Sequence, residues 1–203
     1  MRFLWFAAAV ACLALGGCSS SEPAKEAAIP GPKVPEVFKI KLDTSKGPVA
    51  IEIHRDWAPI GADHLYDLVK HGYYDGVRFF RVLPGFVAQF GLAADPAVTK
   101  KWVNARIPDD PVTQHNVAGT LVYATSGPAS RTTQLFINMA DNSRLDSQGF
   151  APLGTVISGM EAVMSFYSGY GESPDQQAIT GQGNEYLQGH FPMLDFIKTA
   201  TVE

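Results

Sequence analysis

Residues 79–91 read FFRVLPGFVAQFG, and this stretch decides the fold. Apolar and aromatic residues fill both sides of Pro84-Gly85, a pair that favours a tight turn, so we expect a β-hairpin here. One arginine, Arg81, and one glutamine, Gln89, interrupt the apolar run. A glutamine among such neighbours is costly to bury without a hydrogen-bonding partner, which indicates a polar task for that side chain.

A second short stretch has the same character. Residues 134–138 read QLFIN, an apolar strand that opens on a glutamine. Together the two stretches resemble the active-site strands of cyclophilin-type peptidyl-prolyl cis-trans isomerases, and the resemblance extends from about Val37 to Val202. It implies an enzyme that accelerates rotation about Xaa-Pro peptide bonds, with proline-containing polypeptides as its partners.

The rest of the pattern is typical of a mainly β protein. Apolar segments between Gly/Pro turns predict eight strands, at approximately 36–43, 48–54, 77–83, 86–90, 119–124, 134–138, 152–157 and 195–202. Two helices are expected, over 59–71 and 159–167, because apolar residues recur there at helical spacing. Many short strands favour a barrel. The resemblance implies the cyclophilin fold, a closed eight-stranded antiparallel β-barrel capped by two α-helices.

Composition narrows the possible functions. A chain of 203 residues with 46% hydrophobic and 18% charged residues suits one globular domain. The formal net charge of −4 leaves no basic footprint, so nucleic acid is not an expected partner. The five histidines show no metal-ligand spacing and no glycine-rich phosphate loop is present. We therefore expect no metal and no cofactor. The chain is also expected to be a monomer.

The N-terminal residues predict export. A basic start precedes an apolar stretch, residues 3–15, that is too short to span a bilayer as a stable helix. Leu15-Gly16-Gly17-Cys18 resembles a bacterial lipobox. We expect a lipoprotein signal peptide over 1–17, with Cys18 as the lipid-bearing N-terminus. The alternatives are an ordinary cleaved signal peptide or a buried helix with an incidental cysteine.

Residues 18–35 are rich in Ser, Pro, Ala and charge, which predicts a flexible tether before a cyclophilin-like domain over 36–203. The expected location is the cell envelope, with the protein anchored to a membrane by its lipid and facing the periplasm. Ser19, next to the lipid-bearing cysteine, favours the outer membrane, if the cell has one, by resemblance to sorted lipoproteins.

The chemistry of bond rotation sets what a catalyst needs. Rotation about an Xaa-Pro bond crosses a barrier of about 20 kcal/mol because amide resonance is lost. In the twisted state the prolyl nitrogen regains a lone pair. A catalyst therefore needs a dry pocket for proline, a donor or cation aimed at that nitrogen, and a grip on the flanking backbone. None of these requires a nucleophile, a metal or a cofactor.

The resemblance assigns roles residue by residue. It implies that Arg81 faces the prolyl nitrogen and that Gln89 positions the arginine and the substrate backbone. It places the substrate contacts in a proline pocket and an adjoining peptide groove, at Phe86, Val87, Ala124, Thr125, Gln134, Phe136, Leu145 and Phe150.

Two departures from the family pattern concern the pocket rim. Arg144 stands where many eukaryotic members carry a tryptophan, and Phe150 stands where they carry a histidine. Both bear on drug and substrate binding more than on bond rotation. Cyclophilins that bind cyclosporin tightly use that tryptophan to donate a hydrogen bond to the drug.

Two other function classes remain open at this point. One is a weakly catalytic proline-peptide-binding chaperone or scaffold, and the other is a structural envelope lipoprotein that keeps only the barrel. The intact arginine and glutamine argue against the second. Two long segments, 92–117 and 168–193, are expected to be irregular, and the latter leaves room for the scaffold.

Overall fold

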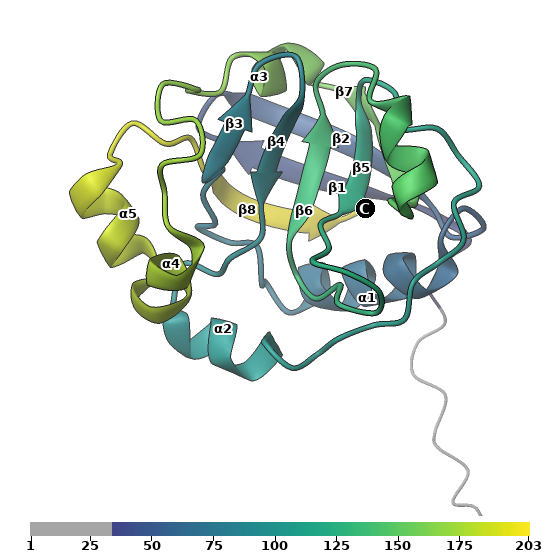
Figure 1. The fold of residues 1–203 in the computed structure, drawn as a ribbon, viewed down its shortest axis with the longest axis horizontal. Helices are drawn as coiled ribbons and strands as arrows, with labels where there is room; N and C mark the ends of the chain where they lie inside the picture. Colours follow the sequence, from purple (N-terminus) through teal and green to yellow (C-terminus); the bar gives the residue numbers. More distant parts are fainter. Residues whose placement is uncertain (1–33) are drawn as a thin grey trace, which may run out of the picture. The chain divides into compact units, whose positions relative to one another are not determined.

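Eight strands form one curled antiparallel sheet in the computed structural model, which describes residues 34–203 (Figure 1). They are β1 (Val37–Thr44), β2 (Gly47–His54), β3 (Arg81–Leu83), β4 (Val87–Phe90), β5 (Thr120–Tyr123), β6 (Leu135–Asn138), β7 (Pro152–Ser158) and β8 (Ile197–Val202). Their order across the sheet is β3-β4-β6-β5-β7-β2-β1-β8. The expected signal peptide, Cys18 and nearly all of the tether fall on residues 1–33, outside the described residues.

The strands lie where the sequence predicts them, with small shifts at their ends. In β1, for example, Phe38, Ile40 and Leu42 are buried and the residues between them are more exposed, which is the period of a half-buried strand. The main exception is the predicted strand 77–83, of which only the last three residues form β3.

The prediction of a closed barrel is wrong. The sheet has two edges, β3 and β8, and these strands do not pair with each other. Near these edges, the backbone of residues 76–79 meets that of residues 195–197 through a bridge between Arg78 and Phe196 and a few hydrogen bonds. Because this contact ends before β3 begins, the ladder does not continue, and the sheet is an open half-barrel.

The helices are α1 (Pro59–Lys70), α2 (Pro96–Trp102), the 3-10 helix η1 (Ser143–Gln148), α3 (Met160–Met164), α4 (Gln176–Gln182) and α5 (Asn184–His190). The two predicted helices correspond to α1 and to a shorter α3, which lie at opposite ends of the sheet (Figure 1). The prediction missed α2, α4 and α5 inside the two long segments. The sequence signals for α2 and α4 are Asp95 and Asp175, whose side chains accept hydrogen bonds from the first turns of these two helices.

Asp110 completes the N-terminus of α1 from a distant part of the chain. Its carboxylate accepts hydrogen bonds from the backbone N–H groups of Ile60 (3.0 Å) and Gly61 (2.8 Å). The same carboxylate pairs with buried Arg131 at 3.0 Å. A carboxylate at a helix N-terminus is stabilising, so Asp110 ties α1 to the segments that precede β5 and β6.

Three buried apolar clusters pack on the sheet within residues 34–203, and one of them, around Phe136, belongs to the site described below. The largest fills the curl of the sheet and includes Val82, Phe90 and Ile137. Another, which we call the outer cluster, contains Phe80, Leu92, Ile179, Leu187 and Leu194. The outer cluster joins α4 and α5 to the chain just before β3, and these helices lie on the β3 side of the sheet (Figure 1).

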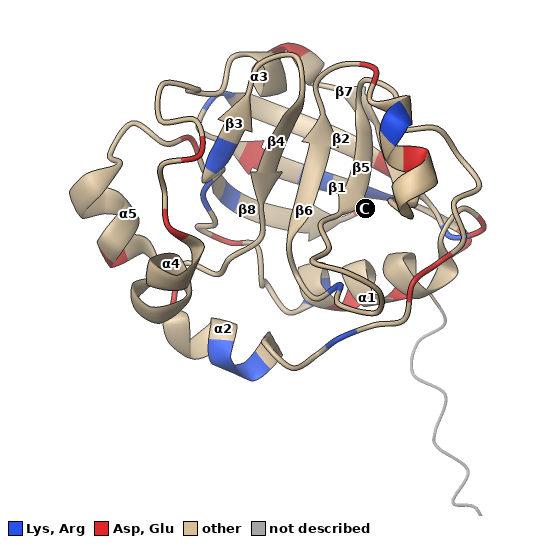
Figure 2. Ribbon diagram, viewed as in Figure 1, with Lys and Arg blue, Asp and Glu red and all other residues tan. Residues whose placement is uncertain are grey.

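The surface carries both signs of charge, with Lys and Arg interspersed among Asp and Glu along the ribbon (Figure 2). Within residues 34–203, no helix combines the length and apolar character that crossing a membrane requires.

Candidate active site

Four side chains form a row across neighbouring strands. Arg81 on β3 lies opposite Gln89 on β4, and Gln89 lies opposite Phe136 on β6. Phe136 in turn lies opposite Val122 on β5. Because directly opposed residues of antiparallel strands project to the same face, the row places one cation, one amide and two apolar side chains side by side.

The row borders a cavity of about 260 Å³, which we call the proline pocket. Its lining residues are Arg81, Phe86, Val87, Gln89, Ala124, Thr125, Phe136, Leu145, Gln148 and Phe150. Val87, Phe136 and Leu145 are buried in one apolar cluster beneath it. The pocket therefore has an apolar floor and a cation with an amide at its edge.

The guanidinium of Arg81 is held on two sides. Its Nη1 donates to Gln89 Oε1 at 3.3 Å, and its Nε donates to Glu172 Oε1 at 2.6 Å. Its central carbon lies 5.5 Å from the ring centroid of Phe86, within the range of a cation–π interaction. The arginine thus lies against the pocket wall with its orientation set by three neighbours.

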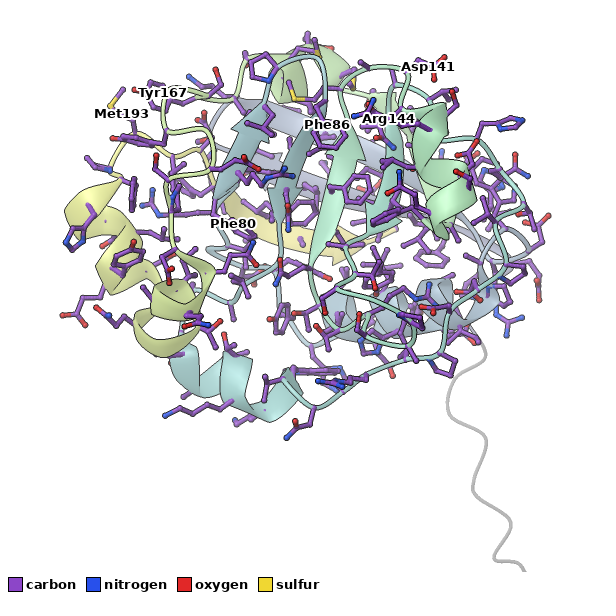
Figure 3. The ribbon with its side chains drawn as sticks, in the orientation of Figure 1. Phe80, Phe86, Asp141, Arg144, Tyr167 and Met193 are labelled. Atoms are coloured by element: carbon purple, nitrogen blue, oxygen red, sulfur yellow. The ribbon has the colours of Figure 1, made fainter. Side chains whose placement is uncertain are left out.

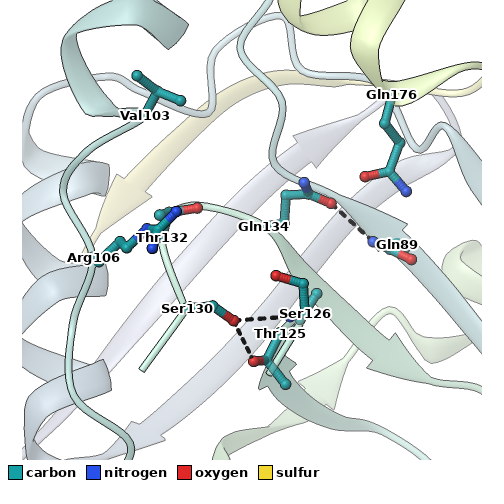
Figure 4. Close-up of a pocket in the computed structure, with 10 residues that line it drawn as sticks. Gln89, Val103, Arg106, Thr125, Ser126, Ser130, Thr132, Gln134 and Gln176 are labelled. Carbon is teal, nitrogen blue, oxygen red and sulfur yellow. Dashed lines mark hydrogen bonds between the residues drawn. The ribbon is translucent and has the colours of Figure 1, made fainter. Parts of the chain in front are cut away.

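Gln89 satisfies both ends of its amide. While Oε1 accepts from the arginine, Nε2 donates to Gln134 Oε1 at 2.9 Å (Figure 4). The residue is only 8% exposed, so both bonds offset the cost of burying the amide. These two bonds are the polar task that the sequence indicates for Gln89.

A second cavity of about 360 Å³ adjoins the proline pocket, and we call it the neighbouring pocket. It is lined by Gln89, Val103, Arg106, Ala124, Thr125, Ser126, Ser130, Thr132, Gln134 and Gln176 (Figure 4). Val103 and Arg106 come from the segment 92–117, and Gln176 begins α4. Both long segments therefore reach the site, whereas their length alone indicated a functional role without saying where they lie.

Comparison with known proteins decides the family. The sequence model described as "Cyclophilin type peptidyl-prolyl cis-trans isomerase/CLD" matches residues 38–180. The chain belongs to this family. It is a cyclophilin-type peptidyl-prolyl cis-trans isomerase, which confirms the resemblance and favours an enzyme over the scaffold and the purely structural alternatives.

Curated relatives of the isomerase carry the same name. A peptidyl-prolyl cis-trans isomerase of Acinetobacter baylyi is 37% identical over 61% of this chain and 69% of its own length. A probable peptidyl-prolyl cis-trans isomerase of Brucella abortus is 34% identical over 77% of this chain and 80% of its own.

Solved structures support the fold. A cyclophilin-type isomerase of Cryptosporidium parvum, crystallised in the presence of the dipeptide Ala-Pro, matches with a TM-score of 0.60 at 19% identity. The match covers 81% of this chain and 98% of that one. The cyclophilin AquaCyp293 of Hirschia baltica matches with a TM-score of 0.57 at 19% identity, over 82% of this chain and 77% of its own.

At the rim of the isomerase's pocket, the ring of Phe86 has two arginines within the range of a cation–π interaction. The guanidinium carbon of Arg144 is 4.8 Å from its ring centroid, closer than that of Arg81 at 5.5 Å. Figure 3 shows Arg144 beside Phe86. Arg144 is exposed and its Nη1 donates to Asn142 Oδ1 at 3.3 Å. The rim beside Phe86 therefore carries a solvated charge.

Three buried asparagines support the pocket wall from behind. Asn142 donates to the carbonyl oxygen of Phe86 (2.9 Å) and to Asn138 Oδ1 (2.7 Å). Asn138 donates to Asn116 Oδ1 (3.1 Å), and Asn116 donates to the carbonyl oxygen of Phe150 (2.9 Å). The network joins the β3–β4 turn to the far wall. This network was not predicted from the sequence, although Asn138, which ends an apolar strand, and Asn142, which follows it, were a usable signal.

The structure brings the predicted site residues together. The predicted catalytic and substrate-binding residues all line the proline pocket except Gln134, which lines the neighbouring pocket and contacts Gln89, while the predicted lipidation site Cys18 lies outside the described residues. The Thr125 hydroxyl is occupied within its own turn, where it donates to the carbonyl oxygen of Gly127 at 2.5 Å. The contributions of Gln148 and Glu172 were not foreseen, because nothing in their local sequence distinguishes them from other polar loop residues.

Proposed function

We propose that the isomerase binds an Xaa-Pro segment with the proline ring in the proline pocket and Arg81 facing the prolyl nitrogen. The observation that carries this proposal is the position of the guanidinium, joined to Gln89 and lining the same apolar cavity as Phe86 and Phe136. A five-membered ring is apolar and compact, so an apolar floor favours it over water.

Catalysis then follows from a difference between two states of the substrate. In the planar amide the nitrogen lone pair is delocalised, and in the twisted state it is free to accept a hydrogen bond. A bond from a charged donor is worth about 1.5–3 kcal/mol. Because it strengthens only as the bond twists, it lowers the barrier rather than the ground state. At about tenfold per 1.36 kcal/mol, Arg81 supplies one to two decades in rate.

The flanking peptide lies along the groove formed by Gln134, Ala124 and the neighbouring pocket. Gln134 is polar and half-buried at the border of the two cavities. Gln89 links Arg81 to Gln134 by hydrogen bonds. The same three side chains therefore contact both the proline in the pocket and the substrate backbone in the groove.

The substrates we propose are exported proteins in the cell envelope, where the isomerase is anchored by a lipid on Cys18. The support is the lipobox-like Leu15-Gly16-Gly17-Cys18 and the polar sequence over 18–35. The protein is proposed to act as a monomer that assists folding, since isomerisation of Xaa-Pro bonds is slow without a catalyst.

A direct assay tests the catalytic proposal. Exchange NMR of a short Ala-Pro peptide measures the cis/trans rate with wild-type enzyme and with Gln89→Leu, which keeps the volume and removes the amide. We expect fast exchange with the wild type and a several-fold slower rate with the variant. An unchanged rate in Gln89→Leu contradicts the role given to the hydrogen-bonded chain.

A further inference from the structure

Glu172 forms a close ion pair with the arginine of the active site. Its Oε1 lies 2.6 Å from Arg81 Nε and 2.5 Å from Arg81 Nη2. On the opposite side Nη1 donates to Gln89. An arginine has five N–H groups, so these contacts leave one N–H on each terminal nitrogen for a substrate.

The loop that carries Glu172 has a defined shape. Two successive turns enclose it: the N–H of Gly171 donates to the carbonyl oxygen of Ser168 (3.0 Å), and that of Ser173 to Tyr170 (2.9 Å). Gly171 has a φ of +53°, a left-handed conformation that suits glycine. The carboxylate is therefore presented by an ordered turn and does not depend on a long unsupported side chain.

The loop is also attached to the outer cluster through Tyr170, two residues before Glu172. The ring of Tyr170 packs edge-to-face against Tyr167 (4.9 Å) and Phe191 (5.1 Å), next to the outer cluster. That cluster includes Phe80, the residue directly before Arg81. The same packing that buries Phe80 thus fixes the distance between the loop and β3.

The helix that follows the loop is held near Ala94 by a glycine whose surroundings leave no room for a side chain. Gly183, between α4 and α5, has a φ of +60°, and a Cβ there would collide with the carbonyl oxygen of Ala94. Beside it, Asn184 donates from its backbone N–H to Ala94 (2.8 Å) and from Nδ2 to Gly76 (2.9 Å). The family match ends at residue 180, so part of this attachment lies beyond it.

We propose that Glu172 is a positioning residue for Arg81, and that the segment 168–193 exists in part to present it. This inference rests on the proposed catalytic role of Arg81. Glu172 binds the Nε edge of the guanidinium and turns its free N–H groups toward the proline pocket. A free arginine side chain loses rotamer entropy when it is ordered. With Glu172 in place, the Arg81 side chain is already ordered before substrate binds, so its rotamer entropy is not lost during binding or catalysis.

Kinetics on single variants test the proposal. Glu172→Ala removes both contacts, and Glu172→Gln keeps one oxygen acceptor without the charge. We expect kcat to fall about three- to tenfold in Glu172→Ala, with KM within about twofold, because the effect acts through a transition-state contact. The kcat of Glu172→Gln should lie between those of the wild type and Glu172→Ala. Glu185→Ala, an exposed carboxylate of the same segment, is the matched control and should match the wild type.

Two further measurements separate positioning from a general structural effect. In an Arg81→Ala background, Glu172→Ala should cause no additional loss, since the two residues act as a unit. In side-chain NMR, the Nε–H signal of Arg81 should be protected from water exchange in the wild type and exposed in Glu172→Ala. The melting temperature should barely change, because an exposed ion pair contributes little to stability.

Three results would overturn the inference. An unchanged kcat in Glu172→Ala shows that the ion pair has no catalytic consequence, and an increased kcat shows that it restrains the arginine from the substrate. An equal loss in the Arg81→Ala background shows that Glu172 acts elsewhere. Full activity of Arg81→Ala alone instead overturns the proposed catalytic role, while the Nε–H protection still reports on the ion pair.

Discussion

Arg81 and Gln89 lie directly opposite each other on β3 and β4, and a 3.3 Å hydrogen bond joins their side chains. The register of a short hairpin sets this pairing, since a shift of one residue would turn one of the two side chains to the other face. Gln89 extends the contact to Gln134, which comes from the segment before β6. The hairpin alone therefore places the proposed catalytic pair, and the rest of the groove is assembled from elsewhere.

The catalytic role of Arg81 is tested by its removal. We expect Arg81→Ala to fold normally and to lose about tenfold or more in kcat/KM, the value of one charge-assisted hydrogen bond in the twisted state. Arg81→Lys should lie between, because lysine keeps the charge and loses the planar fork. A protease-coupled assay gives the rates. Arg55→Ala, whose arginine pairs with Asp63, is the control. Turnover at the wild-type level by Arg81→Ala contradicts the mechanism.

The position of Arg144 over the Phe86 ring predicts weak sensitivity to cyclosporin. Burying its charge against an apolar macrocycle costs free energy unless the charge is paired. We expect an active wild type that is poorly inhibited, and an Arg144→Trp variant that binds the drug at least several-fold tighter. Arg144→Ala separates the loss of charge from the gain of the indole. Inhibition titrations decide the matter; tight inhibition of the wild type shows that Arg144 is not in the tryptophan's place.

Membrane attachment through Cys18 predicts a change in fractionation. In cells that express Cys18→Ala, the protein should move from the detergent-extractable membrane fraction to the soluble fraction, or persist as an unprocessed precursor. Acyl chains contribute about 0.8 kcal/mol per buried methylene, so several chains hold a protein firmly. Cys12→Ala, within the expected signal peptide, is the control. If both variants fractionate like the wild type, the lipoprotein prediction is wrong.

His64 predicts a loss of stability at mildly acidic pH. This half-buried residue of α1 donates from Nε2 to the carbonyl oxygen of Thr132 at 2.8 Å. Burial lowers its pKa, and the bond to Thr132 opposes that shift only in part. In the unfolded chain His64 has its ordinary pKa of about 6.5, so just below that pH the unfolded state binds more protons than the folded state. The free energy of unfolding therefore falls as the pH drops through about 6.5.

Denaturant unfolding between pH 7.5 and 5.5 measures the effect. The slope due to one proton is at most about 1.4 kcal/mol per pH unit. His64→Gln should flatten the dependence, whereas His190→Gln, at an exposed position, should leave it unchanged. An identical slope in His64→Gln assigns the titration to another group.

The sequence by itself determined the local elements and the identity of the site. Alternating apolar and polar residues in segments such as 37–44 predict strands, because each strand buries one face and successive side chains point to opposite faces. Arg81, Gln89 and the pocket residues were recognisable because they occur in two short stretches whose pattern resembles a family. The role of Asp110 was not predictable from the sequence, because its partners at the start of α1 are distant in the chain.

Tertiary structure alone decided how the sheet ends and what surrounds the arginine. Whether β3 and β8 pair depends on where two distant segments diverge, and no local pattern specifies that point. The same holds for Glu172, which contacts Arg81 although the two residues are 91 positions apart in the sequence. A glutamate in a Gly/Ser/Pro-rich loop looks like any solvated charge. Only the packing of the outer cluster places it 2.6 Å from Arg81 Nε, since that distance depends on how α4 and α5 pack beside β3.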